Sequence, residues 1–281
     1  MDHSPTALFA VDSHYSIGHT HLVCEDYTRH GLDPVPHVLV ADGCSSSDDS
    51  DMGARLLVLR ASAMLESLLH TEDPRQHHWE VGRDLIRRCL LQVEALDLEP
   101  TALDSTLLLA YRRHDQLWVH CYGDGVLALQ ERGGGLRVIQ VDYAHNAPFY
   151  LSYLANSERH DLYRRTVGDN ALAITTFDPR GQPQVVHHPY DHPLVFSFAV
   201  DTVQALAIAS DGVGSLVALP AQKRLSPWEI VAELLDFSLS QAGPTPDFTK
   251  RRLRDMLGDC ARRNILNADD IGLGVFLRTS P

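Results

Sequence analysis

The chain has 281 residues, of which 44% are hydrophobic and 22% are charged, and its formal net charge is −13 at pH 7. The composition is typical of a globular protein, and the negative charge argues against a nucleic-acid partner, which needs a basic face. The absence of a secretory signal and of an apolar run of about 18 residues predicts a cytoplasmic protein without a membrane partner. The five scattered cysteines are then expected to be free thiols.

Hydrophobic periodicity predicts groups of strands and helices along the chain. We expect strands at 6–13 and 36–41, helices at 52–69 and 79–96, and two hairpins formed by strands at 105–111, 116–122, 126–131 and 136–141. Strands at 172–176, 195–200 and 205–209, helices at 226–240 and 248–265, and a last strand at 271–277 follow. The apolar run from Val38 to Ala41 is typical of a strand buried on both faces. Ser226 and Pro227 predict a capped start for the third helix.

The separation of the helices from the hairpin-linked strands predicts an α+β fold made of packed layers. The elements interleave and no linker or repeat divides them, so we expect a single domain over residues 1–281. Residues 142–192 are the hardest part to interpret, because they mix aromatic, histidine and proline residues without a clear period.

Three predicted strands end in an Asp-Gly pair, and another acidic pair precedes the last strand. These pairs are Asp42-Gly43, Asp124-Gly125, Asp211-Gly212 and Asp269-Asp270, and Glu25-Asp26 lies ahead of strand 36–41. Each Asp-Gly alone is better explained as a tight turn. Together they indicate a metal site, because carboxylates at the ends of core strands converge and repel one another unless cations neutralise them. Oxygen ligands favour Mg²⁺ or Mn²⁺.

The same motifs resemble, in order and spacing, those of the metal-dependent serine/threonine protein phosphatases of type 2C, and the chain resembles a divergent, bacterial-like member. That family has a Gly, an Arg and Asn-Glu-Asp, then a strand into Asp-Gly, a Thr-rich strand start, Gly-Asp-Ser, Ser-Asp-Gly and a final Asp-Asn. The corresponding segments here are Gly18, His21, Cys24 to Asp26, Val38 to Gly43, Asp104 to Thr106, Gly123 to Gly125, Ser210 to Gly212 and Asp269 to Ile271. They extend in patches from about residue 13 to residue 276.

The resemblance implies a four-layer α-β-β-α sandwich with two central, mainly antiparallel sheets and a metal cleft at one edge between them. It also implies hydrolysis of phosphoserine or phosphothreonine on a phosphorylated protein substrate. Two cations about 3.5–4 Å apart would polarise a water for attack on phosphorus and neutralise the phosphoryl oxygens. Residues 142–192 would include the flap beside the cleft, where substrate choice is set.

The resemblance further implies a role for each acidic residue around Mn²⁺ or Mg²⁺. Asp42 would bridge two metals and would be central to catalysis. Asp211 and Asp269 would complete the first metal site. Glu25 and the Gly43 carbonyl would serve the second.

Three more residues complete the implied site. Asp26 would hold metal-bound water, and Asp124 would hold a weaker third metal. His21 stands where the family has the arginine that anchors the substrate phosphate. Because histidine is cationic only below its pKa, we expect weaker substrate binding at alkaline pH, unless His21 merely faces solvent.

The loop after Gly43 departs most from the family. Cys44 to Ser47 replace a Gly-Gly pair, and Cys44 stands where some members carry a histidine that acts as a general acid. Asp270 takes the place of an asparagine. The lost arginine and the lost glycines favour an alternative, a pseudophosphatase that binds metal or phosphoproteins without turnover. The retention of every metal carboxylate favours catalysis, because unused converging carboxylates would destabilise the fold. A phosphatase of small phosphate esters is a third hypothesis.

Overall fold

Two β-sheets packed face to face form the centre of the molecule. The computed structural model describes residues 8–219, 221–234 and 246–279. The seven-stranded sheet consists, in spatial order, of β1 (Phe9–Ser16), β15 (Ile271–Arg278), β11 (Val203–Ala209), β6 (Gly125–Glu131), β7 (Leu136–Tyr143), β8 (Leu172–Phe177) and β9 (Pro183–His188). The five-stranded sheet consists of β10 (Leu194–Ala199), β5 (Gln116–Tyr122), β4 (Leu107–Arg113), β3 (His37–Ala41) and β2 (Tyr27–Gly31). The paired strands in both sheets are antiparallel.

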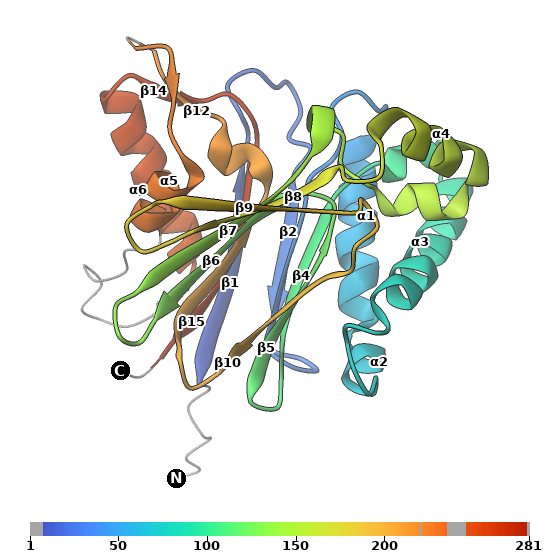
Figure 1. Cartoon of the computed structure of the whole chain (residues 1–281), viewed down its shortest axis with the longest axis horizontal. Coiled ribbons are helices and arrows are strands. Elements are labelled where there is room, and N and C mark those ends of the chain that lie inside the picture. The colour runs from blue at the N-terminus through green and yellow to red at the C-terminus, as the bar shows by residue number, and fades with distance from the viewer. Residues whose placement is uncertain (1–7, 220, 235–245, 280–281) are drawn as a thin grey trace.

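Helices cover the outer face of each sheet (Figure 1). On the five-stranded sheet lie α1 (Ser50–Ala63), α2 (Leu65–Leu69) and α3 (His78–Ala95), and on the seven-stranded sheet lie α5 (Pro227–Leu234) and α6 (Phe248–Arg262). The remaining elements are α4 (Ser157–Val167), the 3₁₀ turns η1 (Pro100–Leu103), η2 (Ala144–Asn146), η3 (Leu151–Ala155) and η4 (Asp211–Gly214), and a small sheet of β13 (Lys223–Arg224), β12 (Leu216–Ala218) and β14 (Ile265–Asn267). This arrangement confirms the predicted α-β-β-α sandwich.

Side-chain alternation along β3 shows how one strand serves two of the cores. All five of its residues are buried. Val38 and Val40 belong to the core between the two sheets, whereas Leu39 and Ala41 belong to the core beneath α1 and α3. Successive residues of a strand point to opposite faces, so a continuous apolar run is required at this central position. β3 therefore holds its C-terminal end, and the residue that follows it, firmly between the layers.

Two of the predicted helices differ from the structure, one by an interruption and one by an earlier end. The predicted helix 52–69 is interrupted at Met64, where α1 ends and α2 begins. The predicted helix 248–265 ends at Arg262, because Asn264 adopts a left-handed conformation with φ 56° and the chain then enters β14.

The start of the third predicted helix is confirmed. The Ser226 hydroxyl oxygen accepts a hydrogen bond from the Glu229 backbone N–H at 3.3 Å, and the Glu229 carboxylate accepts one from the Ser226 N–H at 3.0 Å. This reciprocal pair is the capping box expected at a helix start. Residues 235–240 of that prediction lie outside the described residues.

Residues 142–192 contain more regular structure than the sequence indicated. Only the strand at 172–176 was expected there, and it corresponds to β8. Helix α4 was missed because Tyr163 is its single buried residue, so the helix shows little apolar periodicity. Strand β9 was missed because its side chains are almost all exposed.

Within the described part of the chain, no helix combines the length and hydropathy that a membrane span requires.

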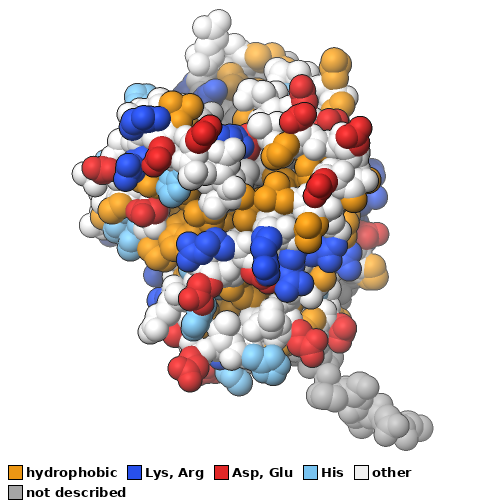
Figure 2. Space-filling model, turned by 90° about the vertical axis from the view of Figure 1, so that its right-hand side faces the viewer, with side chains coloured by type: hydrophobic (Ala, Val, Ile, Leu, Met, Phe, Trp, Pro, Cys, Tyr) orange, Lys and Arg blue, Asp and Glu red, His pale blue; other side chains and the backbone are white. Residues whose placement is uncertain are grey.

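Figure 2 looks onto the face that carries α3 and α4, where Lys and Arg side chains gather in a band between acidic and hydrophobic patches. This face therefore carries positive as well as negative side chains, although the net charge of the chain is negative. The single domain over residues 1–281 stays a prediction.

Candidate active site

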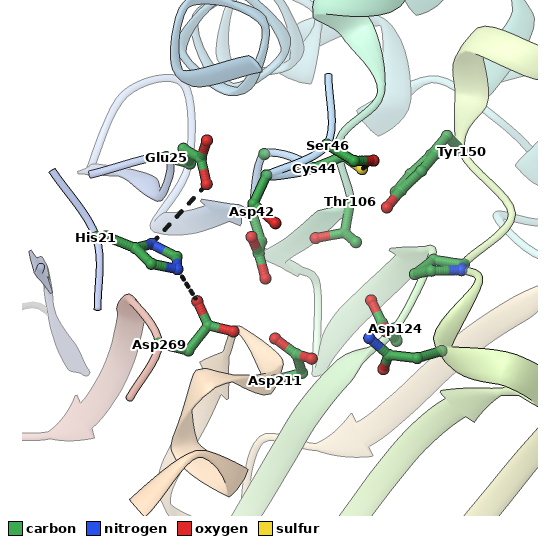
Figure 3. Close-up of a pocket in the computed structure, with 14 residues that line it drawn as sticks. His21, Glu25, Asp42, Cys44, Ser46, Thr106, Asp124, Tyr150, Asp211 and Asp269 are labelled. Atoms are coloured by element: carbon green, nitrogen blue, oxygen red, sulfur yellow. Dashed lines mark hydrogen bonds and ion pairs between the residues drawn. The ribbon is translucent and has the colours of Figure 1, made fainter. Parts of the chain in front are cut away.

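An acidic hollow lies where several strands of the two sheets end. Its lining includes five carboxylates from segments far apart in the sequence, namely Glu25, Asp42, Asp124, Asp211 and Asp269. Asp42 follows β3, Asp124 joins β5 to β6, Asp211 follows β11, and Asp269 precedes β15. Figure 3 shows the five side chains turned toward the same space. The fold thus brings together acidic residues that the sequence placed at strand ends.

The glycines beside these aspartates are needed for the backbone to follow its path. Gly123 and Gly125, on either side of Asp124, have φ values of 94° and 141°, which other residues rarely adopt. A Cβ at Gly212 would lie only 1.6 Å from the backbone carbonyl oxygen of Asp270. Gly212 therefore permits the close approach of η4 to the start of β15.

Burial and mutual repulsion raise the pKa values of Asp42, Asp124 and Asp269. Burial raises the pKa of Asp42 most, and the charges of Asp26 and Asp211 add to it. Burial followed by the charge of Asp211 likewise raises the pKa values of Asp124 and Asp269. The hollow therefore holds more negative charge than its own side chains neutralise, and a cation would relieve this repulsion.

His21 lines one side of the hollow, where its ring nitrogens face carboxylates. Nε2 lies 3.3 Å from Asp269 Oδ1, and Nδ1 lies 3.2 Å from Asp270 Oδ2 and 3.9 Å from Glu25 Oε2 (Figure 3). Burial lowers the pKa of His21, but the hydrogen bond to Asp270 and the charges of Asp269 and Glu25 outweigh it, so the pKa is raised. With 19% of its side chain exposed, His21 does not merely face solvent. Its predicted contact with substrate phosphate stays a prediction.

Asp270 fastens the N-terminal loop to the start of β15. Its Oδ1 accepts a hydrogen bond from the Gly18 N–H at 2.7 Å, and its Oδ2 accepts one from the Glu25 N–H at 2.6 Å. An asparagine has a single acceptor oxygen and could satisfy only one of these donors. The aspartate that departs from the family pattern is thus suited to this loop, and it does not line the hollow.

Asp26 lies behind the wall of the hollow. It is 2% exposed, and its Oδ2 accepts a hydrogen bond from the Ser210 hydroxyl at 2.7 Å. Its Oδ1 is buried and has no hydrogen-bond partner, and burial, together with the charge of Asp270, raises its pKa. The Gly43 backbone does line the hollow, and its N–H donates to the Glu25 carbonyl at 3.2 Å. The metal roles of Asp26 and Gly43 stay predictions.

The sequence placed residues 142–192 beside the cleft, but it identified none of the residues that form the wall facing His21 across the hollow. Tyr150, Asn146 and Pro148 form this wall, and all come from the segment that gave no periodic signal. A buried tyrosine in an irregular segment carries no pattern that separates a site residue from a core residue. Thr106 and the Cys44 side chain also line the hollow.

The comparisons with known proteins agree with this architecture. The sequence matches the family model described as protein phosphatase 2C over residues 13–258. The chain belongs to the protein phosphatase 2C family. This type 2C membership makes it a serine/threonine protein phosphatase by class, as the order of its motifs predicted. A search of the curated proteins gives no match.

Solved structures show the same type 2C fold at low sequence identity. A bacterial serine phosphatase shares 11% identity, with 97% of this chain and 98% of that chain covered and a TM-score of 0.56. Stp1 from Staphylococcus aureus shares 10% identity, with 97% of this chain and 96% of that chain covered and a TM-score of 0.53. PstP/Ppp from Mycobacterium tuberculosis shares 14% identity, with 97% of this chain and 99% of that chain covered and a TM-score of 0.53. At such identities the likeness supports the sandwich fold alone.

Proposed function

We propose that this type 2C chain hydrolyses phosphoserine or phosphothreonine on protein substrates and depends on Mn²⁺ or Mg²⁺ for turnover. The observation that carries the proposal is the convergence of five carboxylates on one hollow at the ends of strands from both sheets. The five free cysteines suit a reducing compartment, so we place the enzyme in the cytoplasm.

The donor set of the hollow fits hard divalent cations. Carboxylate and carbonyl oxygens are the ligands that Mg²⁺ and Mn²⁺ prefer, and the raised pKa values mark negative charge that is not neutralised. Asp42, Asp211, Asp269 and Glu25 would hold two cations, and Asp124 would hold a third. When bound, such cations activate water for attack on phosphorus and neutralise the phosphoryl oxygens.

The rest of the chain positions these ligands and encloses the substrate. The Thr106 N–H and the Ser105 hydroxyl each donate to the Asp42 carbonyl at 2.8 Å, which fixes the backbone at the central carboxylate. His21 Nε2 lies 3.3 Å from Asp269 Oδ1 and helps to orient the Asp269 carboxylate. The segment from η2 to α4 borders the opposite side of the hollow, where it would contact the phosphorylated partner and set substrate choice.

Hydrolysis of a phosphothreonine peptide tests this function directly. Metal-loaded wild type is compared with chelator-treated protein and with Asp42→Asn and Asp211→Asn. Turnover should require the metal, and each substitution should lower kcat/KM by at least about 100-fold because it removes a metal ligand. Asp48→Asn is the matched control, since Asp48 is exposed and does not line the hollow. Activity that survives the chelator or both substitutions would contradict the proposal.

A pseudophosphatase is the second candidate, because no lysine or arginine is among the described residues that line the hollow. This function predicts that Mn²⁺ raises the melting temperature of wild type, but not of Asp42→Asn, while several phosphopeptides remain intact. Comparing phosphopeptides with nucleotides separates both candidates from a phosphatase of small esters.

A further inference from the structure

Among the described residues that line the hollow, none has a side chain with a permanent positive charge that could bind a phosphate. His21 is the one group among its described lining residues that can become cationic, and its ring nitrogens face carboxylates at 3.2 and 3.3 Å. Bound metals neutralise charge, but the outer phosphoryl oxygens still need hydrogen-bond donors that fix their orientation. These donors must come from another part of the lining.

Tyr150 offers such a donor on the wall opposite His21. Its ring is 9% exposed, and Figure 3 shows its hydroxyl turned into the hollow. Burial, with a smaller contribution from Cys44, raises the pKa of Tyr150, so the phenol keeps its proton and remains a donor. Cys44 lines the hollow with Tyr150, and its thiol is bonded to the Ser46 hydroxyl at 3.1 Å. A phosphoryl oxygen in the hollow would be a far stronger acceptor for the Tyr150 hydroxyl than a thiol sulfur.

The segment around Tyr150 is held rigidly, as a substrate-orienting group requires. The neighbouring Phe149 ring packs against Tyr163 and Tyr190 with centroids 5.2 and 5.1 Å apart. The Ser152 hydroxyl donates to the buried Asp104 carboxylate at 2.5 Å. Aromatic packing of Phe149 and the buried hydrogen bond of Ser152 therefore hold the backbone on both sides of Tyr150, and the Tyr150 ring packs against Tyr153 with centroids 5.6 Å apart.

The Asn146 side chain provides a second hydrogen-bond donor on the same wall, in a segment whose backbone is strained. His145 and Asn146 are consecutive residues with positive φ, 61° and 53°, in η2. Two adjacent non-glycine residues in this region are unfavourable and persist where the surrounding structure imposes them, often at functional sites. Asn146 lines the mouth of the hollow, and its side-chain amide has two N–H donors.

We propose that Tyr150 and Asn146 together bind the phosphoryl oxygens of the substrate and take the place of an arginine anchor. The proposal rests on the proposed phosphatase function and names a further subsite within it. The anchor consists of neutral donors, so it orients the phosphoryl group without adding charge to the hollow. It lies across the hollow from His21, on the segment that borders the path of the protein substrate.

Steady-state kinetics of Tyr150→Phe and Asn146→Ala test the subsite, with a phosphothreonine peptide and with p-nitrophenyl phosphate. Each substitution removes a hydrogen bond to a charged group, so KM and the inhibition constant of inorganic phosphate should both rise by about 10- to 100-fold. Tyr153→Phe is the matched control, because Tyr153 belongs to the same aromatic cluster, with its centroid 5.6 Å from that of Tyr150, but does not line the hollow. It should keep both constants at wild-type values.

The outcomes separate this inference from the function on which it rests. If wild type is active with metal and both variants keep the wild-type KM and phosphate inhibition, the subsite is wrong and the phosphatase function stands. If wild type shows no turnover, the phosphatase function fails, and calorimetry of inorganic phosphate binding to metal-loaded protein then decides the subsite. Weaker phosphate binding by Tyr150→Phe than by Tyr153→Phe supports it, and equal binding overturns it.

Discussion

Acid should loosen the attachment of helix α3 to the five-stranded sheet, because two histidines are buried between them. His78 begins α3 and His120 lies on β5, both with no exposed surface. Their Nδ1 atoms are 3.1 Å apart and their rings are stacked with centroids 5.4 Å apart. One neutral ring donates to the other across this contact. Burial disfavours the charged form of both rings and lowers the pKa of His78 well below its ordinary value and that of His120 to about 4. Protonation would also place two N–H groups face to face across this contact.

The magnitude follows from the shift of His120. A histidine whose folded pKa is lowered stabilises the fold fully above its ordinary pKa of about 6.5, and this stability is lost as the pH falls toward the folded pKa. With a folded pKa of about 4, the free energy of unfolding should decrease by about 2.5 kcal/mol between pH 7 and pH 4.5 from this ring alone. Protonation of His78 acts in the same direction.

Urea unfolding of wild type and His120→Gln at pH 7 and pH 4.5 measures how much His120 contributes to the acid-induced decrease in the free energy of unfolding. Glutamine retains hydrogen-bonding groups but does not titrate, so the variant should lose about 2.5 kcal/mol less than wild type on acidification. Both proteins are measured with chelator present, so that metal release does not contribute. His70→Gln, at an exposed position, is the control and should match wild type. Equal acid losses in wild type and His120→Gln would refute the reasoning.

Three further substitutions test how the hollow is built, each by its effect on melting temperature. Gly212→Ala should prevent stable folding or cost several kcal/mol, since its Cβ would lie 1.6 Å from a backbone oxygen; a wild-type melting temperature would contradict this. Asp104→Ala should cost about 1.5–3 kcal/mol and speed proteolysis near α4, because the partly exposed Arg159, bonded at 2.7 Å, loses its buried partner; unchanged cleavage would count against this prediction. Asp270→Asn should cost about 1–3 kcal/mol, because one backbone N–H loses its acceptor, and undiminished stability would show that the second acceptor is dispensable.

The sequence predicted those parts of the fold that depend on periodicity and on local turn chemistry. β3 was predicted from its continuous apolar run, and the start of α5 from Ser226 and Pro227. Four carboxylates of the hollow were found because each lies beside the end of a predicted strand, where sheet geometry brings such residues together, and Glu25 was found because it lies ahead of strand 36–41. The order of the motifs then supplied the family.

The sequence could not predict features that depend on long-range packing. Tyr150 lies in a segment without apolar period, and tertiary contacts of its neighbours Phe149 and Ser152 hold that segment beside the hollow. The position of Asp26 behind the wall was also beyond sequence reasoning, because its partner Ser210 is 184 positions away. Residues that serve a site through tertiary contacts leave no local pattern to detect.

The pairing of the first strand with the last has a consequence for biosynthesis. β1 is antiparallel to β15 along its whole length, from Phe9 opposite Arg278 to Ser16 opposite Ile271, and the Gly18 N–H is bonded to Asp270 across 252 positions. Because a ribosome releases the N-terminus first, β1 must wait without this neighbour until β15 has been translated. A nascent chain that ends before Asp269 would hold the other four carboxylates of the hollow, but it would lack the contacts that complete the hollow and tie it to the N-terminal loop.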